Sequence, residues 1–464
     1  MGHKGFIAIV VGLLAVIGGV IWVLNAPVKP LTLKEALPIT RFNLSNGLTL
    51  LVVENPRAET ISHMIFIRKG AADDPAGKSG LAHYAEHMMF KGTKTVSGDE
   101  YDRRIAALGG EGNAFTTSDY TAYYVNAPAS ALERVMSLEA DRFMNLRFDD
   151  LEAKTELSVV QEERKLRIES SPQAILAEQM DAVQFVLHPY RIPTIGFDQD
   201  IANLTSNDVR NFIARNYVPD NMVLVVSGAV QPKNVRRLAM RYFGAMKQEK
   251  SLKREWATEP PARAARLVTY RDDRVSQRQW VRQYAMPSLG MDADKTTDIL
   301  ALGLATQWLG GGRTGLLYQM LVDEMKVAVN VGAYYNDAQV GPGTLSIYVT
   351  PAEGVSLQHI SRSVDKALQK ILAMTPTDEE LARAKTLQRA DIVYAQDSLM
   401  GIPSYLGLLA MVGKNEQYFY QLPEAINALL AQDMSRVLQS YLKESESVTG
   451  YLLPRKTVAQ ENAP

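Results

Sequence analysis

The chain has 464 residues, of which 46% are hydrophobic and 22% are charged, and its formal net charge is −1. This length suits two or three folded domains, and the composition is that of a globular protein. A net charge near zero gives no general attraction to nucleic acid, so no nucleic-acid partner is expected. The absence of cysteine excludes disulfides, thiol nucleophiles and cysteine-type zinc sites, so a metal would have to be held by histidine and carboxylate side chains.

The first residues form an apolar stretch without charges. It runs for 19 residues, from Phe6 to Leu24, which is long enough to cross a bilayer as a helix. A cleaved signal peptide is the alternative, but its apolar region usually spans about 7–15 residues and ends in small residues. We therefore expect residues 1–28 to be a retained transmembrane anchor, with a signal peptide as the alternative. The following domains are expected in the periplasm, anchored to the bacterial inner membrane or, after cleavage, secreted.

The first half of the remaining chain predicts alternating strands and helices. Residues 41–56 predict a β-hairpin, because Asn46 and Gly47 separate two alternating apolar runs. Residues 62–70 predict a strand, and a helix follows with Ser79 as its N-cap. The next expected elements are a strand, an amphipathic helix and a long helix, over residues 121–129, 130–145 and 150–169.

The second half repeats this order. It predicts a strand and two helices, over residues 344–354, 356–372 and 379–395. The segments "YVNAPA" (124–129) and "YVTPAE" (348–353) occupy the same place in each half. This repetition predicts an α+β protein with two homologous domains, each a mixed or antiparallel sheet packed with helices. We place the domains at 38–248 and 265–460, joined by a charged, proline-bearing seam at 248–265.

The segment "LAHYAEHMMFKGT" (81–93) carries two of the six histidines of the chain. On a helix, His83 and His87 lie one turn apart on the same face, so both imidazoles can reach one metal ion. Two histidines and a distant carboxylate form a known catalytic zinc set that leaves a position for water. Glu86 lies beside the pair and could accept the proton of that water. Local spacing leaves the third ligand open.

A histidine pair on a helix is often only solvated or hydrogen-bonded to its neighbours. The H-x-x-E-H spacing makes that interpretation less favourable here, because the motif rarely arises by chance and follows a glycine turn on a predicted helix. No ligand-spaced neighbour accompanies His63, His188 or His359. We therefore predict a metal at His83 and His87.

H-x-x-E-H is the signature of the inverzincins. The sequence resembles the pitrilysin/insulinase family of zinc peptidases, and most closely its short branch, which includes the mitochondrial processing peptidase and paired bacterial subunits. Residues 83–93 match the zinc helix of that family, 112–124 resemble its substrate-edge strand, and 188–196 resemble another of its blocks. The resemblance spans nearly all of the chain after the predicted anchor.

The resemblance implies one Zn²⁺ per chain and names its remaining ligand. In the family, a glutamate about 76 residues beyond the second histidine completes the metal site, and that position is Glu163 here. Glu162 is the neighbouring alternative in register. A second family glutamate, seven residues before the ligand, corresponds to Glu156 and is expected to support the site. Glu86 is expected to be the general base.

The resemblance also implies a peptide substrate bound by β-strand addition. Asn113, Ala114 and Phe115 begin the strand whose exposed edge would pair with an extended peptide. An ordinary edge strand without this role is the structural alternative.

The sequence departs from the family in its second half. Active members usually carry an arginine and a tyrosine seven residues apart, which bind substrate and stabilise the oxyanion. Val322 and Val329 stand at these positions here, and neither side chain can donate a hydrogen bond. Arg313, Tyr334 and Tyr335 are nearby but out of register.

These features predict a zinc metalloendopeptidase subunit that cleaves peptides or unfolded segments. A homologous partner carrying the Arg/Tyr pair would complete it in a heterodimer. One alternative is a self-sufficient peptidase in which Tyr334 or Tyr335 replaces the missing donor. The other is a non-catalytic structural subunit, but such subunits generally lose their zinc residues.

Overall fold

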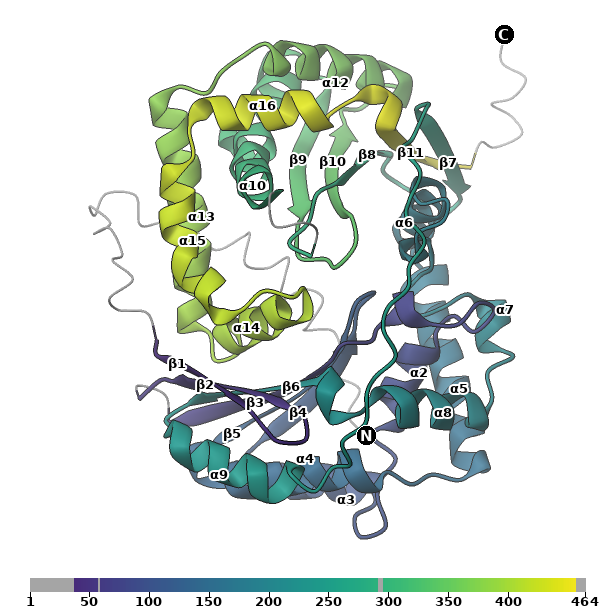
Figure 1. The fold of residues 1–464 in the computed structure, drawn as a ribbon. Helices are drawn as coiled ribbons and strands as arrows, with labels where there is room; N and C mark the ends of the chain where they lie inside the picture. The colour runs from purple at the N-terminus through teal and green to yellow at the C-terminus, as the bar shows by residue number, and fades with distance from the viewer. Residues whose placement is uncertain (1–36, 57–58, 291–294, 456–464) are drawn as a thin grey trace. The chain divides into compact units, whose positions relative to one another are not determined.

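The computed structural model describes residues 37–56, 59–290 and 295–455. From Leu37 onward the chain forms one compact unit that contains two β-sheets (Figure 1). The predicted anchor at 1–28 lies outside the described residues. Within the described ranges, no helix is both long and apolar enough to span a membrane.

The first sheet has six strands in the order β1-β2-β6-β3-β5-β4. They are β1 (Ile39–Asn43), β2 (Thr49–Glu54), β3 (Thr60–Ile67), β4 (Glu111–Thr116), β5 (Thr121–Pro128) and β6 (Met222–Gly228). The predicted hairpin is present as β1 and β2, which pair antiparallel around Gly47, a residue with φ of 98°. Because β2 and β6 pair in parallel and the other neighbours pair antiparallel, the sheet is mixed.

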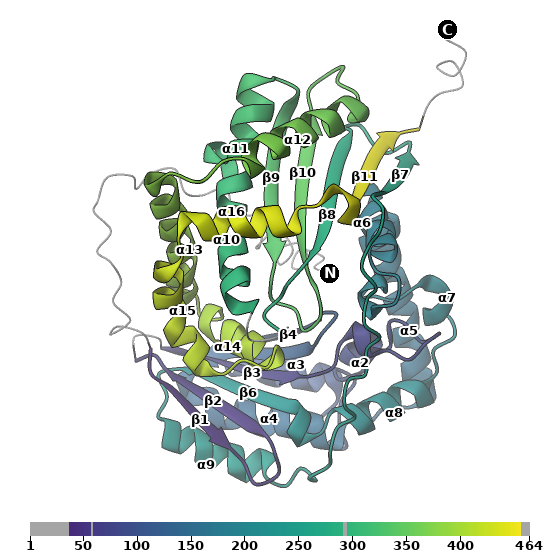
Figure 2. The same ribbon diagram turned by 45° about the horizontal axis from the view of Figure 1, so that its top comes forward.

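The second sheet has five strands in the order β7-β11-β8-β10-β9 (Figure 2). They are β7 (Arg266–Asp272), β8 (Gln279–Met286), β9 (Ala328–Asn336), β10 (Gly343–Pro351) and β11 (Ser447–Pro454). Strand β10 lies beside the edge strand β9, just as β5 lies beside the edge strand β4. The two predicted repeat segments end these corresponding strands, and the predicted α+β class is confirmed.

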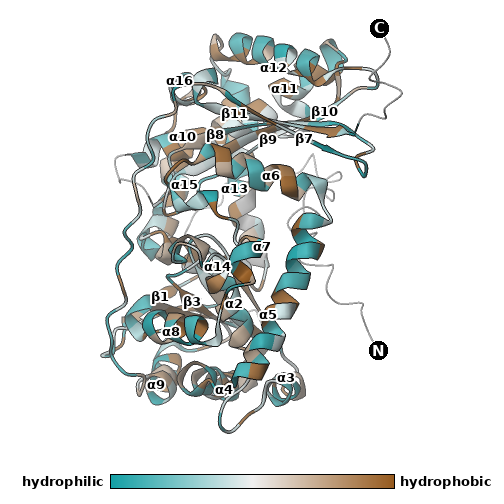
Figure 3. Ribbon diagram, turned by 90° about the vertical axis from the view of Figure 1, so that its right-hand side faces the viewer, coloured by the Kyte–Doolittle hydropathy of each residue, from teal (hydrophilic) through white to brown (hydrophobic). Residues whose placement is uncertain are grey.

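Helices cover both sheets. The longer ones are α3 (Gly98–Ala107), α4 (Leu132–Asn145), α5 (Asp150–Arg164), α6 (Pro172–Gln184), α8 (Ser206–Asn216), α9 (Pro232–Phe243), α10 (Thr296–Gly310), α12 (Leu357–Leu372), α13 (Asp378–Asp397), α14 (Gly401–Met411), α15 (Glu416–Ala428) and α16 (Ala431–Tyr441). The predicted long helix over 150–169 is α5 followed by a π-helical turn, Lys165–Glu169. Figure 3 shows brown, apolar positions among the teal ones along α5. Leu151 in α5 and Leu166 in the π-helical turn after it are exposed.

One helix from the second half of the sequence packs on the first sheet. Ser404 of α14 donates a hydrogen bond to the sulfur of Met64 in β3, and Gly407 lies against the ring of Phe66. A Cβ at Gly407 would lie 2.1 Å from that ring, so only glycine permits the approach. Alternate β3 side chains face the other side of the sheet, where His63 stacks on Phe243 of α9. The central strands are therefore buried on both faces.

The predicted seam lies between α9 and β7, in residues without helix or strand. Arg254 in this segment ion-pairs with Asp73 at 3.0 Å and donates to the backbone carbonyl of Arg68. The connecting segment is therefore fastened to the first sheet's loops.

Candidate metal and catalytic site

Helix α2 (Leu81–Met88) carries His83, Glu86 and His87. Its N-cap is Gly80, so the prediction of Ser79 as N-cap is wrong. The Asp74 carboxylate accepts from the backbone N–H groups of Gly80, Leu81 and Ala82 at 2.8–3.1 Å, and it thereby supplies the capping that a serine would have given. The hydroxyl of Ser79 instead donates to Asp200.

Gly80 explains why the helix begins where it does. Its φ is 88°, and a Cβ there would lie 2.6 Å from the carbonyl oxygen of Ile195. Both conditions require glycine. The start of α2 is therefore fixed by a close backbone contact and by the half-buried carboxylate of Asp74.

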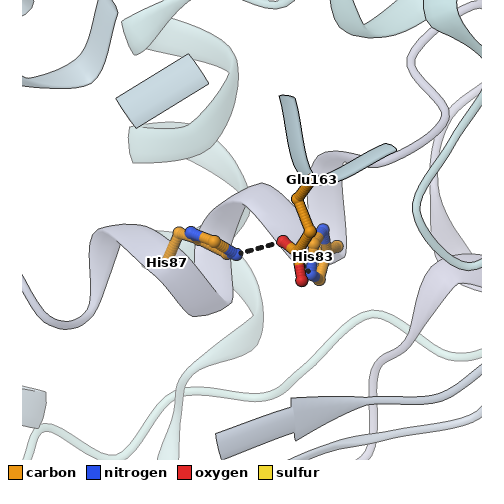
Figure 4. A group of neighbouring side chains, drawn as sticks. All are labelled: His83, His87 and Glu163. Carbon is orange, nitrogen blue, oxygen red and sulfur yellow. Dashed lines mark hydrogen bonds and ion pairs between the residues drawn. The ribbon is translucent and has the colours of Figure 1, made fainter. Parts of the chain in front are cut away.

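Three potential metal ligands converge between α2 and α5 (Figure 4). Oε2 of Glu163 lies 3.1 Å from Nε2 of His87 and 3.5 Å from Nε2 of His83. The neighbouring Glu162 is exposed and ion-pairs with Lys165. The structure thus places Glu163, rather than Glu162, beside the histidines.

These separations suit zinc. Donor atoms bonded to zinc at about 2.0–2.1 Å in a tetrahedral shell lie about 3.4 Å from one another. The Nε2–Oε2 distances at His83 and His87 are close to that value, and all three donor atoms lie within 4.8 Å of one another. Nitrogen and carboxylate oxygen donors also match the preference of zinc. The residues present therefore fit the ion.

A second layer of polar contacts holds the ligand side chains. Nδ1 of His87 lies 2.7 Å from Oε1 of Glu156, and the other oxygen of Glu156 pairs with Lys91. Arg167, in the π-helical turn after α5, ion-pairs with Oε1 of Glu163 at 2.8 Å. Such partners fix the orientation of ligands and influence their basicity.

Burial and hydrogen bonding shift the pKa values of His83 and His87 in opposite directions. Burial lowers the pKa of His83 to about 3, so this imidazole is neutral at ordinary pH. Burial would also lower the pKa of His87, but the hydrogen bonds with Glu156 and Glu163 outweigh it and raise the pKa to about 9. A metal ion must therefore displace a proton from His87, and metal affinity should fall as pH falls.

Glu86 is buried beside the histidines. Thr116, the last residue of β4, donates a hydrogen bond from its hydroxyl to Oε2 of Glu86. Burial raises the pKa of Glu86 to about 7. The end of the edge strand β4 therefore directly contacts the predicted general base.

The predicted substrate residues Asn113, Ala114 and Phe115 lie in β4, and β4 is an edge strand of its sheet. The Ala114 N–H donates at 2.8 Å to the side-chain oxygen of Asn113. Because this N–H bonds to a side chain, we infer that it points away from β5. An extended peptide could replace the Asn113 side chain as its acceptor.

In the second half of the chain, valines stand at the two positions where the family carries hydrogen-bond donors, an arginine and a tyrosine. Val322 lies in a π-helical turn, and Val329 is exposed at the start of β9. Tyr335 is buried, and its hydroxyl donates to the carbonyl oxygen of Pro287. Tyr334 is 61% exposed. Of the two tyrosines considered as replacements, only Tyr334 has an accessible ring.

Sequence reasoning missed several residues that build the site. Asp74 accepts from the N–H groups at the start of α2, and Lys91 ion-pairs with Glu156. Thr116 donates to Glu86, and Arg167 ion-pairs with Glu163. Arg167 lies four residues after Glu163, so helical spacing was an available signal for that pair. Lys91 follows the end of α2 and reaches Glu156 of α5 through tertiary structure. Asp74 contacts N–H groups six to eight residues further along the chain, and Thr116 reaches Glu86 through tertiary structure, so neither contact has helical spacing.

Two family models match the chain. Residues 49–197 match the insulinase domain (peptidase family M16), and residues 203–388 match the domain described as M16 inactive. The chain belongs to the insulinase (M16) peptidase family. His83, His87 and Glu163 all fall within the first match.

Relatives and solved structures agree with this assignment. The zinc protease PqqE of Helicobacter pylori is 28% identical over 92% of this chain and 93% of its own length, and the uncharacterized zinc protease YmxG of Bacillus subtilis is 25% identical over 86% and 94%. The crystal structure of a protease from Helicobacter pylori has a TM-score of 0.84 at 27% identity, covering 90% of this chain and 100% of that one. The periplasmic protease PqqL of Escherichia coli shares the fold, with a TM-score of 0.75 at 19% identity, and the match covers 92% of this chain and 48% of PqqL.

Proposed function

We propose that this chain is the zinc-binding catalytic subunit of an endopeptidase that cleaves peptides or unfolded segments. The observation that carries the proposal is the convergence of His83, His87 and Glu163, with Glu86 on the same helix. The names of the zinc proteases PqqE and YmxG support the same metal and reaction class. We propose one ion per chain, and this count is supported by the single such group of ligands found among the described residues.

The side chains have distinct roles in this proposal. His83, His87 and Glu163 hold the ion, and Glu156 and Arg167 orient two of these ligands. Bound zinc would lower the pKa of a water molecule to about 7 and polarise the peptide carbonyl. Glu86 accepts the proton of the attacking water and then delivers it to the leaving amine.

Strand β4 positions the substrate in this proposal. An extended peptide pairs with the free edge of β4, where the N–H of Ala114 becomes a donor once Asn113 releases it. Because Thr116 at the end of β4 contacts Glu86, a peptide paired with this edge would lie next to the general base. Main-chain pairing favours unfolded segments, since a folded protein rarely presents a free strand.

A homologous partner would supply the missing oxyanion donors. Val322 and Val329 cannot donate hydrogen bonds, although Val329 is exposed. The match with PqqL covers 48% of that longer chain, so one such fold occupies about half of it. This likeness in fold supports an active unit made from two chains of the present kind. The N-terminal segment would hold that heterodimer at the periplasmic face of the inner membrane.

Reconstitution tests this proposal. The purified chain should bind zinc, cleave a fluorogenic unfolded peptide poorly alone, and gain activity by orders of magnitude with a homologous subunit carrying the Arg/Tyr pair. A chelator should abolish the gain. Equal activity of the single chain and the mixture would support the self-sufficient alternative, with Tyr334 as the first donor to mutate. Absence of both zinc and cleavage would support the structural alternative.

A further inference from the structure

Four groups form a closed hydrogen-bonded cluster between the two halves of the chain. Asp119 lies in the turn between β4 and β5, and its Oδ2 accepts from the backbone N–H of Val340 at 2.9 Å. Its Oδ1 accepts from the hydroxyl of Tyr190 at 2.6 Å. The Tyr190 oxygen in turn accepts from the backbone N–H of Gly341 at 2.8 Å. Both carboxylate oxygens of Asp119 are therefore used, and one of them binds the loop between β9 and β10.

The cluster, which we call the Asp119 clasp, is buried. Asp119 is 3% exposed and Tyr190 is 6% exposed. The guanidinium of Arg254 donates to the backbone carbonyl of Asp119, which ties the connecting segment to the same turn. Buried hydrogen bonds to a carboxylate are among the stronger ones in proteins, and removal of one partner leaves the other unsatisfied.

The chain is closely packed where the loop meets the first half. A Cβ at Gly341 would lie 2.5 Å from Nε2 of His188, so a larger residue would push the loop away. His188 packs edge-on against Tyr190 with ring centroids 4.3 Å apart. The contact is therefore fixed in shape as well as by hydrogen bonds.

The same turn also lies next to the proposed chemistry. Thr116 contacts Glu86, and Asp119 follows three residues later. On the other side of the clasp, the loop that holds Val340 and Gly341 begins directly after β9, the edge strand of the second sheet. One tight turn therefore links the general base, the substrate edge β4 and the edge strand β9.

We propose that Asp119 is a positioning residue that fixes β9 relative to β4, so that a peptide on β4 also lies correctly against the second sheet. It acts through the loop at Val340 and does not touch the reacting atoms. The kinetic part of this inference depends on the proposed peptidase function, whereas its geometric part does not.

Tyr190→Phe is the sharpest test, because it removes one oxygen that serves both Asp119 and Gly341. Asp119→Asn is a second variant, because Tyr190 and Val340 donate to different oxygens of the carboxylate and an amide keeps only one of them. Tyr394→Phe is the matched control, because Tyr394 is exposed on α13. Each protein is first checked for folding by thermal unfolding and for zinc content.

Geometry is measured by the distance between two spin labels. The chain has no cysteine, so Lys154→Cys on α5 and Lys370→Cys on α12 introduce the only thiols, both at exposed positions. We expect one narrow distance distribution in the parent and in Tyr394→Phe, and a broader one in the two clasp variants. A distribution as narrow as that of the parent in both clasp variants would overturn the proposal.

Kinetics separates positioning from general destabilisation. For peptides long enough to reach from β4 to the second sheet, the clasp variants should raise KM about tenfold, while KM for short peptides stays unchanged. Destabilisation alone would lower the active fraction, and hence kcat, for both peptides alike. Broadened distances with unchanged KM would overturn the positioning role. The kinetics are measured with the homologous subunit present. Broadened distances in a preparation whose parent cleaves nothing even with that subunit would contradict the peptidase function and leave the geometric clasp standing.

Discussion

Oε1 of Glu156 lies 2.7 Å from Nδ1 of His87, on the opposite side of the ring from Glu163. This contact orients the ring of His87 so that Nε2 faces the other two ligands. We therefore predict that Glu156→Gln weakens zinc binding about 10–100-fold, the usual effect of losing such a supporting contact. Competition with a chromogenic chelator measures it. Glu152→Gln, on the same helix but away from the histidines, is the control, and equal affinities in both variants would contradict the role.

The ligand register gives the second prediction. Glu163→Gln should purify with little or no zinc, because a neutral amide is a poor zinc ligand. Glu162→Gln should keep about one zinc per chain, since Glu162 is exposed and ion-pairs with Lys165 rather than with the histidines. Elemental analysis of the two purified proteins decides between them. Full zinc in Glu163→Gln with loss in Glu162→Gln would reverse the assignment.

The free edge of β4 gives the third prediction. Ala114→Pro removes the N–H that now bonds to Asn113 and that a peptide would use. Proline is tolerated on an edge strand where its missing N–H faces solvent. We expect KM for an unfolded peptide to rise about tenfold, because one hydrogen bond contributes about 1 kcal/mol or more, while zinc content stays unchanged. An unchanged KM would mean that the substrate does not pair at this position.

Buried His63 gives the fourth prediction. Neither ring nitrogen has a hydrogen-bond partner within the described residues, and burial lowers its pKa to about 4. The unfolded chain binds a proton here below about pH 6.5, whereas the folded chain does so only near pH 4. His63 therefore lowers the free energy of unfolding by roughly 3 kcal/mol as pH falls from about 6.5 to about 4.

His63→Leu should remove that part of the pH dependence. Chemical denaturation of both zinc-free proteins between pH 7.5 and 4.5 should show the parent losing more stability on acidification than the variant. The difference between the two curves isolates His63, because all other titrating groups are shared. Parallel curves would show that His63 does not titrate as its burial implies.

The parts of the site that sequence could predict are those set by local periodicity. His83 and His87 share a helix face because they are four residues apart, and the structure places them so. Glu163 had no local signal, and only the resemblance to a family identified it. The N-cap prediction failed at Ser79 because Gly80 is the N-cap and the carboxylate of Asp74, six residues before it, accepts from the first N–H groups of the helix.

The other features that the sequence did not predict arise from tertiary packing. Nothing in residues 401–411 predicts that α14 packs on the first sheet, because its contacts with Met64 and Phe66 join positions far apart in sequence. The Asp119 clasp has the same origin. The strand order was likewise beyond local patterns, although the repeated segments correctly marked β5 and β10 as equivalent strands.

The proposed chemistry depends on Glu86 more than on any other side chain that does not bind the metal. Glu86→Gln keeps the size of the side chain but cannot accept a proton from water. In the preparation that cleaves peptide, this variant should keep about one zinc per chain and lose turnover by about 10²–10⁴-fold. Zinc analysis and turnover are measured on the same sample, freed of parent enzyme. Full zinc with turnover within about threefold of the parent would contradict the role of Glu86 and, with it, the proposed mechanism.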